Sequence, residues 1–250
     1  MTNTEKYFFF TYCFCSLLFL VFTTNYLSLD DIINKAGQMD VASYLLIAKN
    51  SPELINENVN LSRHLAQRFL VPYIIGFFSN TFDIEIFLFF KILNFLFILI
   101  YILILIIYIN FKKFDFNRSL IFYSLLTLNP YIIRNHLFQP VQIHDIIFFS
   151  ACIIFVILLS NKKYIFLILL SFFTIFLRQT SIALSIGISI LLIKNKKILN
   201  LCLLIFLFIC SIFLISIISD FYSSENFKYN YAYGLLNYDF SNIKRLLKFL

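Results

Sequence analysis

The sequence of 250 residues contains no tryptophan, only four glycines and four prolines, and only 13% charged residues. The scarcity of glycine and proline excludes collagen-like and low-complexity chains, in which these residues dominate. The scarcity of charge excludes an ordinary soluble domain, because about a quarter of the residues in such domains are charged. Instead, 61% of the chain is hydrophobic and the mean hydropathy is +0.88. This composition also excludes a disordered chain and predicts that a bilayer surrounds most of the protein.

Residues of the metal-binding and disulfide-forming types are few and poorly spaced. All five cysteines lie within apolar runs and none forms a Cys-x-x-Cys pair. Cys13 and Cys15 are two residues apart, which directs them to different faces of a helix. His136, His144 and Asp145 have no further ligand at a diagnostic spacing. We therefore expect no disulfide framework and no metal site.

The hydrophobic pattern predicts an all-α polytopic membrane protein with about seven transmembrane helices, the first of them a retained signal anchor. The expected spans are residues 7–27, 84–109, 119–133, 143–160, 164–177, 180–193 and 198–219. Residues 65–79 are also apolar, but Arg68 and Pro72 interrupt them, which favours a half-span or an interfacial helix. Lys91 and Asn94 share one face of the strongest span, and we expect that face to turn toward other helices.

Arg178 lies between two apolar runs of 14 residues each. These runs are either two tight crossings or one long, broken segment. We favour two crossings, because the distribution of basic residues along the chain then has one consistent explanation.

Basic residues concentrate in three short connectors between the spans, residues 110–118, 161–163 and 194–197. Together these connectors hold eight lysines and arginines against a single acid. Connectors rich in lysine and arginine stay on the cytoplasmic side, so we expect the N-terminus inside and residues 28–83 outside. The net charge of +7 is then a signal of topology, and no nucleic-acid partner is expected.

One membrane domain covers residues 1–250, because no internal repeat or linker divides the chain. Within it, residues 28–83 form an outer loop in which we expect short helices. Residues 242–250 have the pattern of a further helix that stops soon after it begins. The chain is therefore either naturally short or an incomplete copy of a longer protein.

Polar residues from three outer segments could meet in one cavity at the level of the membrane. They are Asp30, Asp31, Asp40, Arg63, His64 and Arg68 in the first segment, Arg134, His136, Gln139, His144 and Asp145 in the second, and Arg178 and Gln179 in the third. Such a cavity would suit a phosphate-bearing lipid, because guanidinium groups match phosphate oxygens. A carboxylate beside the phosphate can act as a base.

Simpler explanations stand beside this hypothesis. Arg63, Arg134 and Arg178, taken singly, are explained equally well as side chains that reach from helix ends to lipid headgroups. Asp30 and Asp31 directly follow the first span, so they could mark its outer end.

Three segments resemble a known class of enzymes. Residues 40–49, Asp-Val-Ala-Ser-Tyr-Leu-Leu-Ile-Ala-Lys, are similar to the first outer loop of the GT-C class of membrane glycosyltransferases, which includes protein mannosyltransferases and lipid A aminoarabinose transferases. Residues 64–72, with His64, Arg68 and Pro72, resemble the entry to the next membrane segment in bacterial members. Residues 176–180 resemble their outer, arginine-containing break.

The resemblance implies an inverting glycosyltransferase with a GT-C-like arrangement of helices and a polyprenyl-phosphate-linked sugar as its donor. Asp40 matches the acid that deprotonates or orients the acceptor, and Asp30 and Asp31 are alternative acids. Many members have a second acid beside the catalytic one, where this chain has Val41, so no divalent metal is expected. No cofactor is expected either, since the lipid-linked sugar is the substrate.

The same resemblance assigns the substrate-binding residues. Arg68, Arg134 and Arg178 would hold the departing lipid phosphate, where fixed cations stabilise the developing charge. Further candidates are Arg63, His64, His136, Asp145 and Gln179. The expected reaction transfers a sugar to an envelope acceptor on the outer face of the cytoplasmic membrane. The alternative is a non-enzymatic polytopic membrane protein, such as a transporter, a flippase or an envelope-assembly partner.

Overall fold

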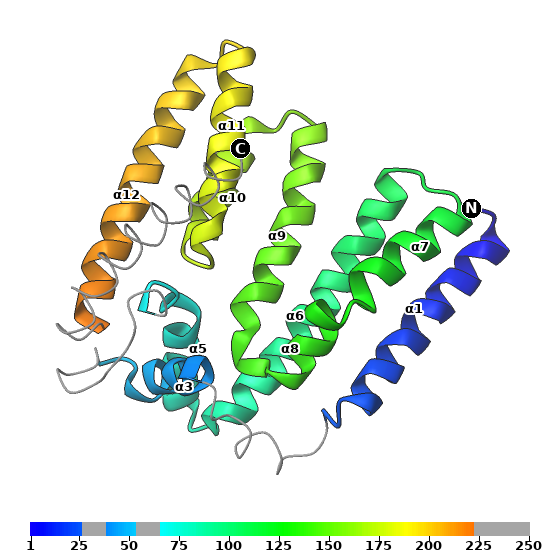
Figure 1. Cartoon of the computed structure of the whole chain (residues 1–250), viewed down its shortest axis with the longest axis horizontal. Coiled ribbons are helices and arrows are strands. Elements are labelled where there is room, and N and C mark those ends of the chain that lie inside the picture. Colours follow the sequence, from blue (N-terminus) through cyan, green and yellow to red (C-terminus); the bar gives the residue numbers. More distant parts are fainter. Residues whose placement is uncertain (27–38, 54–65, 223–250) are drawn as a thin grey trace, which may run out of the picture.

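The computed structural model describes residues 1–26, 39–53 and 66–222, and every regular element in these ranges is helical (Figure 1). Four residues considered for the site lie outside them: Asp30, Asp31, Arg63 and His64. Residues 242–250 also lie outside, and the side chains of Asp40 and Gln179 are not described. The chain is an all-helical membrane protein, as its composition predicted.

Among the described residues, four helical segments are long and apolar enough to cross a bilayer. They are Asn3–Thr23 (α1), Ile86–Phe111 (α6), Pro140–Ser160, which includes α9 (Ile143–Ser160), and Ile198–Ile218, which lies within α12 (Ile198–Tyr222). Large apolar side chains such as Phe19, Ile107 and Phe206 are exposed on their outer surfaces. These surfaces fit a hydrocarbon environment. The full set of seven crossings stays a prediction.

Several other helices are shorter than the bilayer is thick. They are α5 (Leu70–Phe82), α7 (Phe116–Thr127), α10 (Tyr164–Ile175) and α11 (Ile182–Lys194). Helices of 12 or 13 residues measure about 18–20 Å, against about 30 Å of hydrocarbon. The helices α10 and α11 form a hairpin, and Arg178 lies in its turn just before the short 3-10 helix η3 (Gln179–Ser181).

The expected span at residues 119–133 divides into two elements for a local reason. Helix α7 ends at Thr127, and a five-residue π-helix, η1 (Pro130–Arg134), follows it. Pro130 has no backbone N–H to continue the first helix, which makes it suitable for the start of the second. The Asn129 side chain caps η1 by accepting a hydrogen bond from the Tyr131 N–H at 2.9 Å.

Three buried clusters hold the helices together. The largest includes residues of α1, α6, α7, α9 and the short helices near the start of α9. The second cluster, around Leu167, Ile188 and Leu204, joins α10, α11 and α12. The third, around Ile175, Phe176 and Ile215, joins the end of α10 to α12. Lys91 and Asn94 are 6% and 0% exposed, so their shared face does turn toward other helices as predicted.

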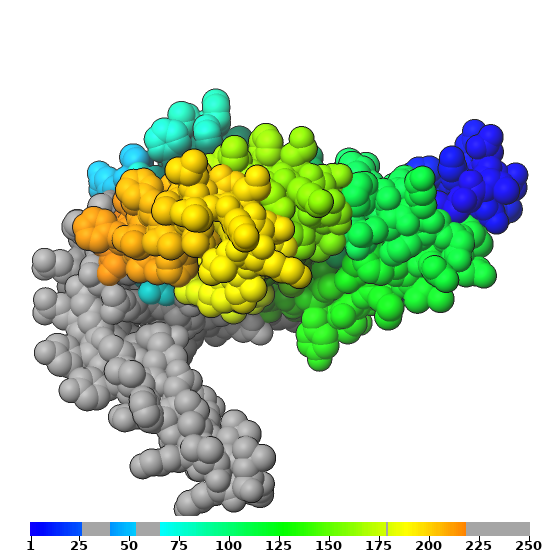
Figure 2. All heavy atoms as spheres, turned by 90° about the horizontal axis from the view of Figure 1, so that it is seen from above, coloured from blue at the N-terminus to red at the C-terminus, as the bar shows by residue number. Residues whose placement is uncertain are grey.

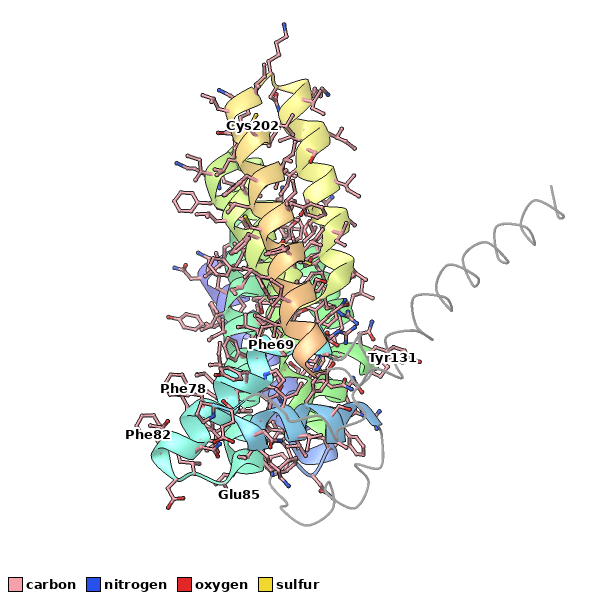
Figure 3. The ribbon with its side chains drawn as sticks, turned by 90° about the vertical axis from the view of Figure 1, so that its left-hand side faces the viewer. Phe69, Phe78, Phe82, Glu85, Tyr131 and Cys202 are labelled. Carbon is pink, nitrogen blue, oxygen red and sulfur yellow. The ribbon has the colours of Figure 1, made fainter. Side chains whose placement is uncertain are left out.

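The two ends of the helix bundle differ in charge. At one end lie the N-terminus of α1 and the turns at residues 110–118, 161–163 and 194–197 (Figure 1); we call it the basic end. The opposite end holds α5, the short helices around residue 136, and α3 (Met39–Asn50). Helix α3 lies across the long helices, end-on in Figure 1 and lengthwise in Figure 3. In Figure 3, Glu85 lies at this end, and Phe78 and Phe82 of α5 point away from the bundle.

Candidate functional site

A polar cavity of about 400 Å³ lies at the start of α9. Its charged or titratable lining residues are Arg68, His136, Asp145 and Arg178. Its other lining residues are Tyr44, Tyr131, Asn135, Gln142 and Phe149. These side chains come from α3, from the residues just before α5, from the segment between α7 and α9, from α9 itself, and from the α10–α11 turn. Segments far apart in the sequence therefore build one site.

Irregular backbone shapes one wall of this cavity. Between α7 and α9 the chain forms η1, then α8 (Asn135–Phe138), then the 3-10 helix η2 (Pro140–Gln142). Asn94 in α6 is fully buried, and its Nδ2 donates a hydrogen bond to the His136 carbonyl at 2.9 Å. In a continuous helix, this carbonyl oxygen would accept a hydrogen bond from a backbone N–H of the next turn. Here the Asn94 side chain satisfies it. A polar residue inside an expected span thus positions the wall of the cavity.

An ion pair joins α9 to the α10–α11 turn inside the cavity. The Arg178 Nε atom lies 2.9 Å from Asp145 Oδ1, and the two side chains are 30% and 13% exposed. The Arg178 guanidinium also lies over the Phe148 ring, 5.9 Å from its centre. Partial burial strengthens such a pair relative to one in water. Asp145 therefore holds the Arg178 side chain at the cavity.

Arg68 is the second cation of the cavity. Its Nη1 donates a hydrogen bond of 3.4 Å to the Tyr44 hydroxyl, which links the start of α5 to α3. The Tyr44 ring packs edge-on against His144, with 4.8 Å between the ring centres. The Arg68 Nε atom is buried and has no hydrogen-bond partner among the described residues. It retains a donor for a ligand.

His136 lines the cavity as a buried, neutral imidazole. It is 1% exposed, and neither ring nitrogen has a hydrogen-bond partner in the described part of the chain. Burial, followed by the positive charge of Arg178, lowers its pKa to about 4. Unpaired buried polar atoms are costly and rare in folded proteins, so an imidazole of this kind on a cavity wall points to a ligand.

The cavity therefore carries net positive charge at neutral pH. Arg68 and Arg178 contribute two positive charges, Asp145 contributes one negative charge, and His136 is neutral. A guanidinium donates two parallel hydrogen bonds to phosphate or carboxylate oxygens. Two guanidinium groups beside a neutral imidazole suit an anionic ligand that also accepts hydrogen bonds from neutral donors.

The structure brings together some of the residues expected from the sequence and separates others. Arg68, His136, Asp145 and Arg178 line the same cavity. Arg134 is exposed and does not line it. Gln139 is half-buried and His144 is buried, and neither lines the cavity. The other candidates fall on undescribed residues or side chains, apart from the backbones of Asp40, near the start of α3, and Gln179, in η3. The roles of all these residues stay predictions.

Sequence reasoning did not select five residues of the lining: Tyr44, Tyr131, Asn135, Gln142 and Phe149. Asn135 and Gln142 lie in the same connector as His136 and Asp145, so their amide side chains were a signal that could have found them. Tyr44 belongs to the segment 40–49 that carried the resemblance. Among the described residues, no group of three or more histidines, cysteines or acids could hold a metal ion.

No protein-family model matches the chain, and neither curated proteins nor solved structures give a significant match. The chemistry of the cavity and of the residues near it is therefore what points to a function.

Proposed function

We propose that this protein is a membrane glycosyltransferase that moves a sugar from a polyprenyl-phosphate donor to an envelope acceptor. The observation that carries the proposal is the cavity in which Arg68 and Arg178, from separate segments, lie beside the buried His136. Two guanidinium groups around a cavity match the phosphate of such a donor. The cavity belongs to an all-helical membrane protein, as a substrate with a lipid tail requires.

Each residue has a distinct task in the proposed reaction. Arg68 and Arg178 bind the lipid phosphate and stabilise its charge as the bond to the sugar breaks. The acceptor hydroxyl attacks the anomeric carbon, and its proton passes to Asp40. The sugar is thereby transferred with inversion, and the polyprenyl phosphate leaves. Support for Asp40 comes from its place near the start of α3, the helix whose Tyr44 lines the cavity.

The proposal includes a topology with seven crossings and the N-terminus in the cytoplasm. The separation of the basic end from the cavity end supports it, because basic connectors stay on the cytoplasmic side. The cavity then opens near the outer face of the cytoplasmic membrane, where envelope acceptors are found.

The proposal is tested with the full chain in proteoliposomes that contain a panel of polyprenyl-phosphate hexoses. We expect Asp40→Asn to lower transfer at least a hundredfold, the scale of a lost general base, while binding of the lipid phosphate persists. Arg68→Gln and Arg178→Gln should each weaken that binding roughly tenfold or more, as the loss of a charged hydrogen bond predicts. Arg118→Gln, an exposed change at the basic end, is the control.

Two results would overturn the proposal. Full transfer by Asp40→Asn would remove the assigned mechanism. Tight binding without transfer of any sugar in the panel would favour the non-enzymatic alternative, a flippase or an assembly partner that recognises the same lipid phosphate.

A further inference from the structure

Three turns at the basic end share one backbone conformation. Lys113, Lys162 and Lys196 have φ angles of 52°, 54° and 54°, in the left-handed region. Each turn closes with the same two backbone hydrogen bonds; in the first, the Lys113 N–H donates to Asn110 O at 3.0 Å and the Phe114 N–H to Ile109 O at 3.3 Å. This is the Schellman pattern, in which glycine usually occupies the left-handed position.

Lysine lowers the stability of the fold at that position. Its Cβ crowds the following carbonyl oxygen, which glycine avoids. The turn also fixes where the backbone of each lysine lies, at the end of the helix before it. Lysines at three such positions therefore concentrate positive charge at one end of the bundle (Figure 2 looks onto this end).

A second cavity lies beside the first of these turns. It has a volume of about 530 Å³ and lies between the first helix α1 and the turn that joins α6 to α7. Lys6 lines it from α1, and Lys113 lines it from the turn. Three phenylalanines complete its apolar side: Phe9, Phe10 and Phe114. The Phe10 ring is 48% exposed on the lipid-facing surface of a candidate span.

The acids nearest in sequence to these lysines are engaged elsewhere. Glu5 accepts the Thr2 N–H at 2.6 Å in the capping box of α1. Asp115 accepts the Arg118 N–H at 2.8 Å and pairs with the Arg118 Nε at 3.4 Å. Within the described ranges, neither Lys6 nor Lys113 forms an ion pair. Their positive charges remain available to a ligand.

We infer that this cavity binds the phosphate headgroup of an anionic membrane lipid. Lys6 and Lys113 contact the phosphate from two sides. Phe10 and Phe114 contact the upper part of the acyl chains, so the site needs a ligand with a charged and an apolar portion. Basic pockets between membrane helices are suited to such headgroups. This site lies at the end of the bundle opposite the Arg68–Arg178 cavity and does not depend on the proposed function.

The test uses the full chain in a neutral detergent, with bound lipids counted by native mass spectrometry. The probes are phosphatidylglycerol, phosphatidylcholine and inorganic phosphate. We expect the unmodified chain to retain phosphatidylglycerol in preference to phosphatidylcholine. The double variant Lys6→Gln, Lys113→Gln should lose about 25-fold in affinity, since each lysine near an anionic surface is worth about fivefold.

The matched control is Lys194→Gln, Lys197→Gln, which removes two exposed lysines of another turn at the same end. It changes the net charge equally and should keep the preference for phosphatidylglycerol. Equal losses in both double variants would show general attraction to the basic end and would overturn the inference. If inorganic phosphate binds as tightly as phosphatidylglycerol, the ligand is not a lipid. If the chain shows no preference for phosphatidylglycerol over phosphatidylcholine, the proposed site is wrong.

Discussion

Gly76 of α5 lies directly against the backbone of Ala48 of α3. A methyl group at Gly76 would come within 2.5 Å of the Ala48 Cα atom, closer than real Cβ contacts allow. The hydrogen of glycine is therefore what lets the two helices cross this closely. Because α3 carries Tyr44 of the cavity, and Asp40 near its start, this crossing also positions part of the candidate site.

We expect Gly76→Ala to push α3 away from α5 and to destabilise the protein by at least 1 kcal/mol, the lower range for overpacking. Ligand binding in the Arg68–Arg178 cavity should fall with it. The control is Gly187→Ala in α11, where a methyl group would meet no atom within 4 Å. Since alanine favours helix over glycine, that variant should be neutral or slightly more stable in thermal unfolding. Equal stability of the two variants would contradict the close crossing.

Asp145→Asn should have opposite effects on stability and on anion binding. The substitution keeps the shape of the side chain but removes the negative charge next to Arg178. An anionic ligand then no longer competes with Asp145 for the guanidinium, so its affinity should rise severalfold. The ligand-free protein should become less stable, because Arg178 loses its ion pair. Titration with a polyprenyl phosphate and thermal unfolding measure the two effects.

The control for that comparison is Asp115→Asn, which removes an exposed acid at the basic end. Its affinity for the polyprenyl phosphate should match that of the unmodified chain. Weaker binding by Asp145→Asn would mean that the carboxylate itself contacts the ligand.

Acidification should destabilise the fold through His136. Its pKa in the folded protein is about 4, below the ordinary value of 6.5. The unfolded chain therefore binds a proton between these pH values while the folded chain does not. The stability that His136 contributes is complete above pH 6.5 and is lost as the pH falls toward 4, by up to about 3 kcal/mol. Thermal unfolding across this range should show a smaller slope for His136→Gln, and an unchanged slope would contradict the shift.

Lys162→Gly should stabilise the protein although it removes a charge. Lys162 has a φ of 54°, which glycine adopts without strain. We expect a gain of about 1 kcal/mol in unfolding free energy. Lys163→Gly removes the same charge at a φ of −85°, where no such strain exists, and should be neutral or destabilising. Equal stabilities for the two variants would contradict the left-handed conformation.

The sequence predicted the membrane class and much of the charged cavity, but not its details. Hydropathy is a sum over many residues, so it identifies long helices such as α6 reliably. Arg68, His136, Asp145 and Arg178 could be grouped from expected topology alone. The direction of the Arg134 side chain could not be predicted, because Arg134 lies in the π-helix η1. There the periodicity of an α-helix no longer shows which face of the helix a residue occupies.

The hairpin of α10 and α11 was predictable in part. Arg178 divides the apolar residues into runs at 164–177 and 180–193, and the two helices follow these runs closely. The partner of Arg178 was not predictable, because its ion pair with Asp145 joins residues that are far apart in the sequence. Tertiary contacts of this kind do not appear in a one-dimensional pattern.

The division of the buried residues into separate clusters has a consequence for biogenesis. A ribosome delivers the residues of the large cluster first, and the helices α10, α11 and α12 emerge afterwards. Arg178 reaches Asp145 only when the later hairpin has docked onto α9. A nascent chain thus acquires the second guanidinium of its cavity only after the residues that form the large cluster have been synthesised.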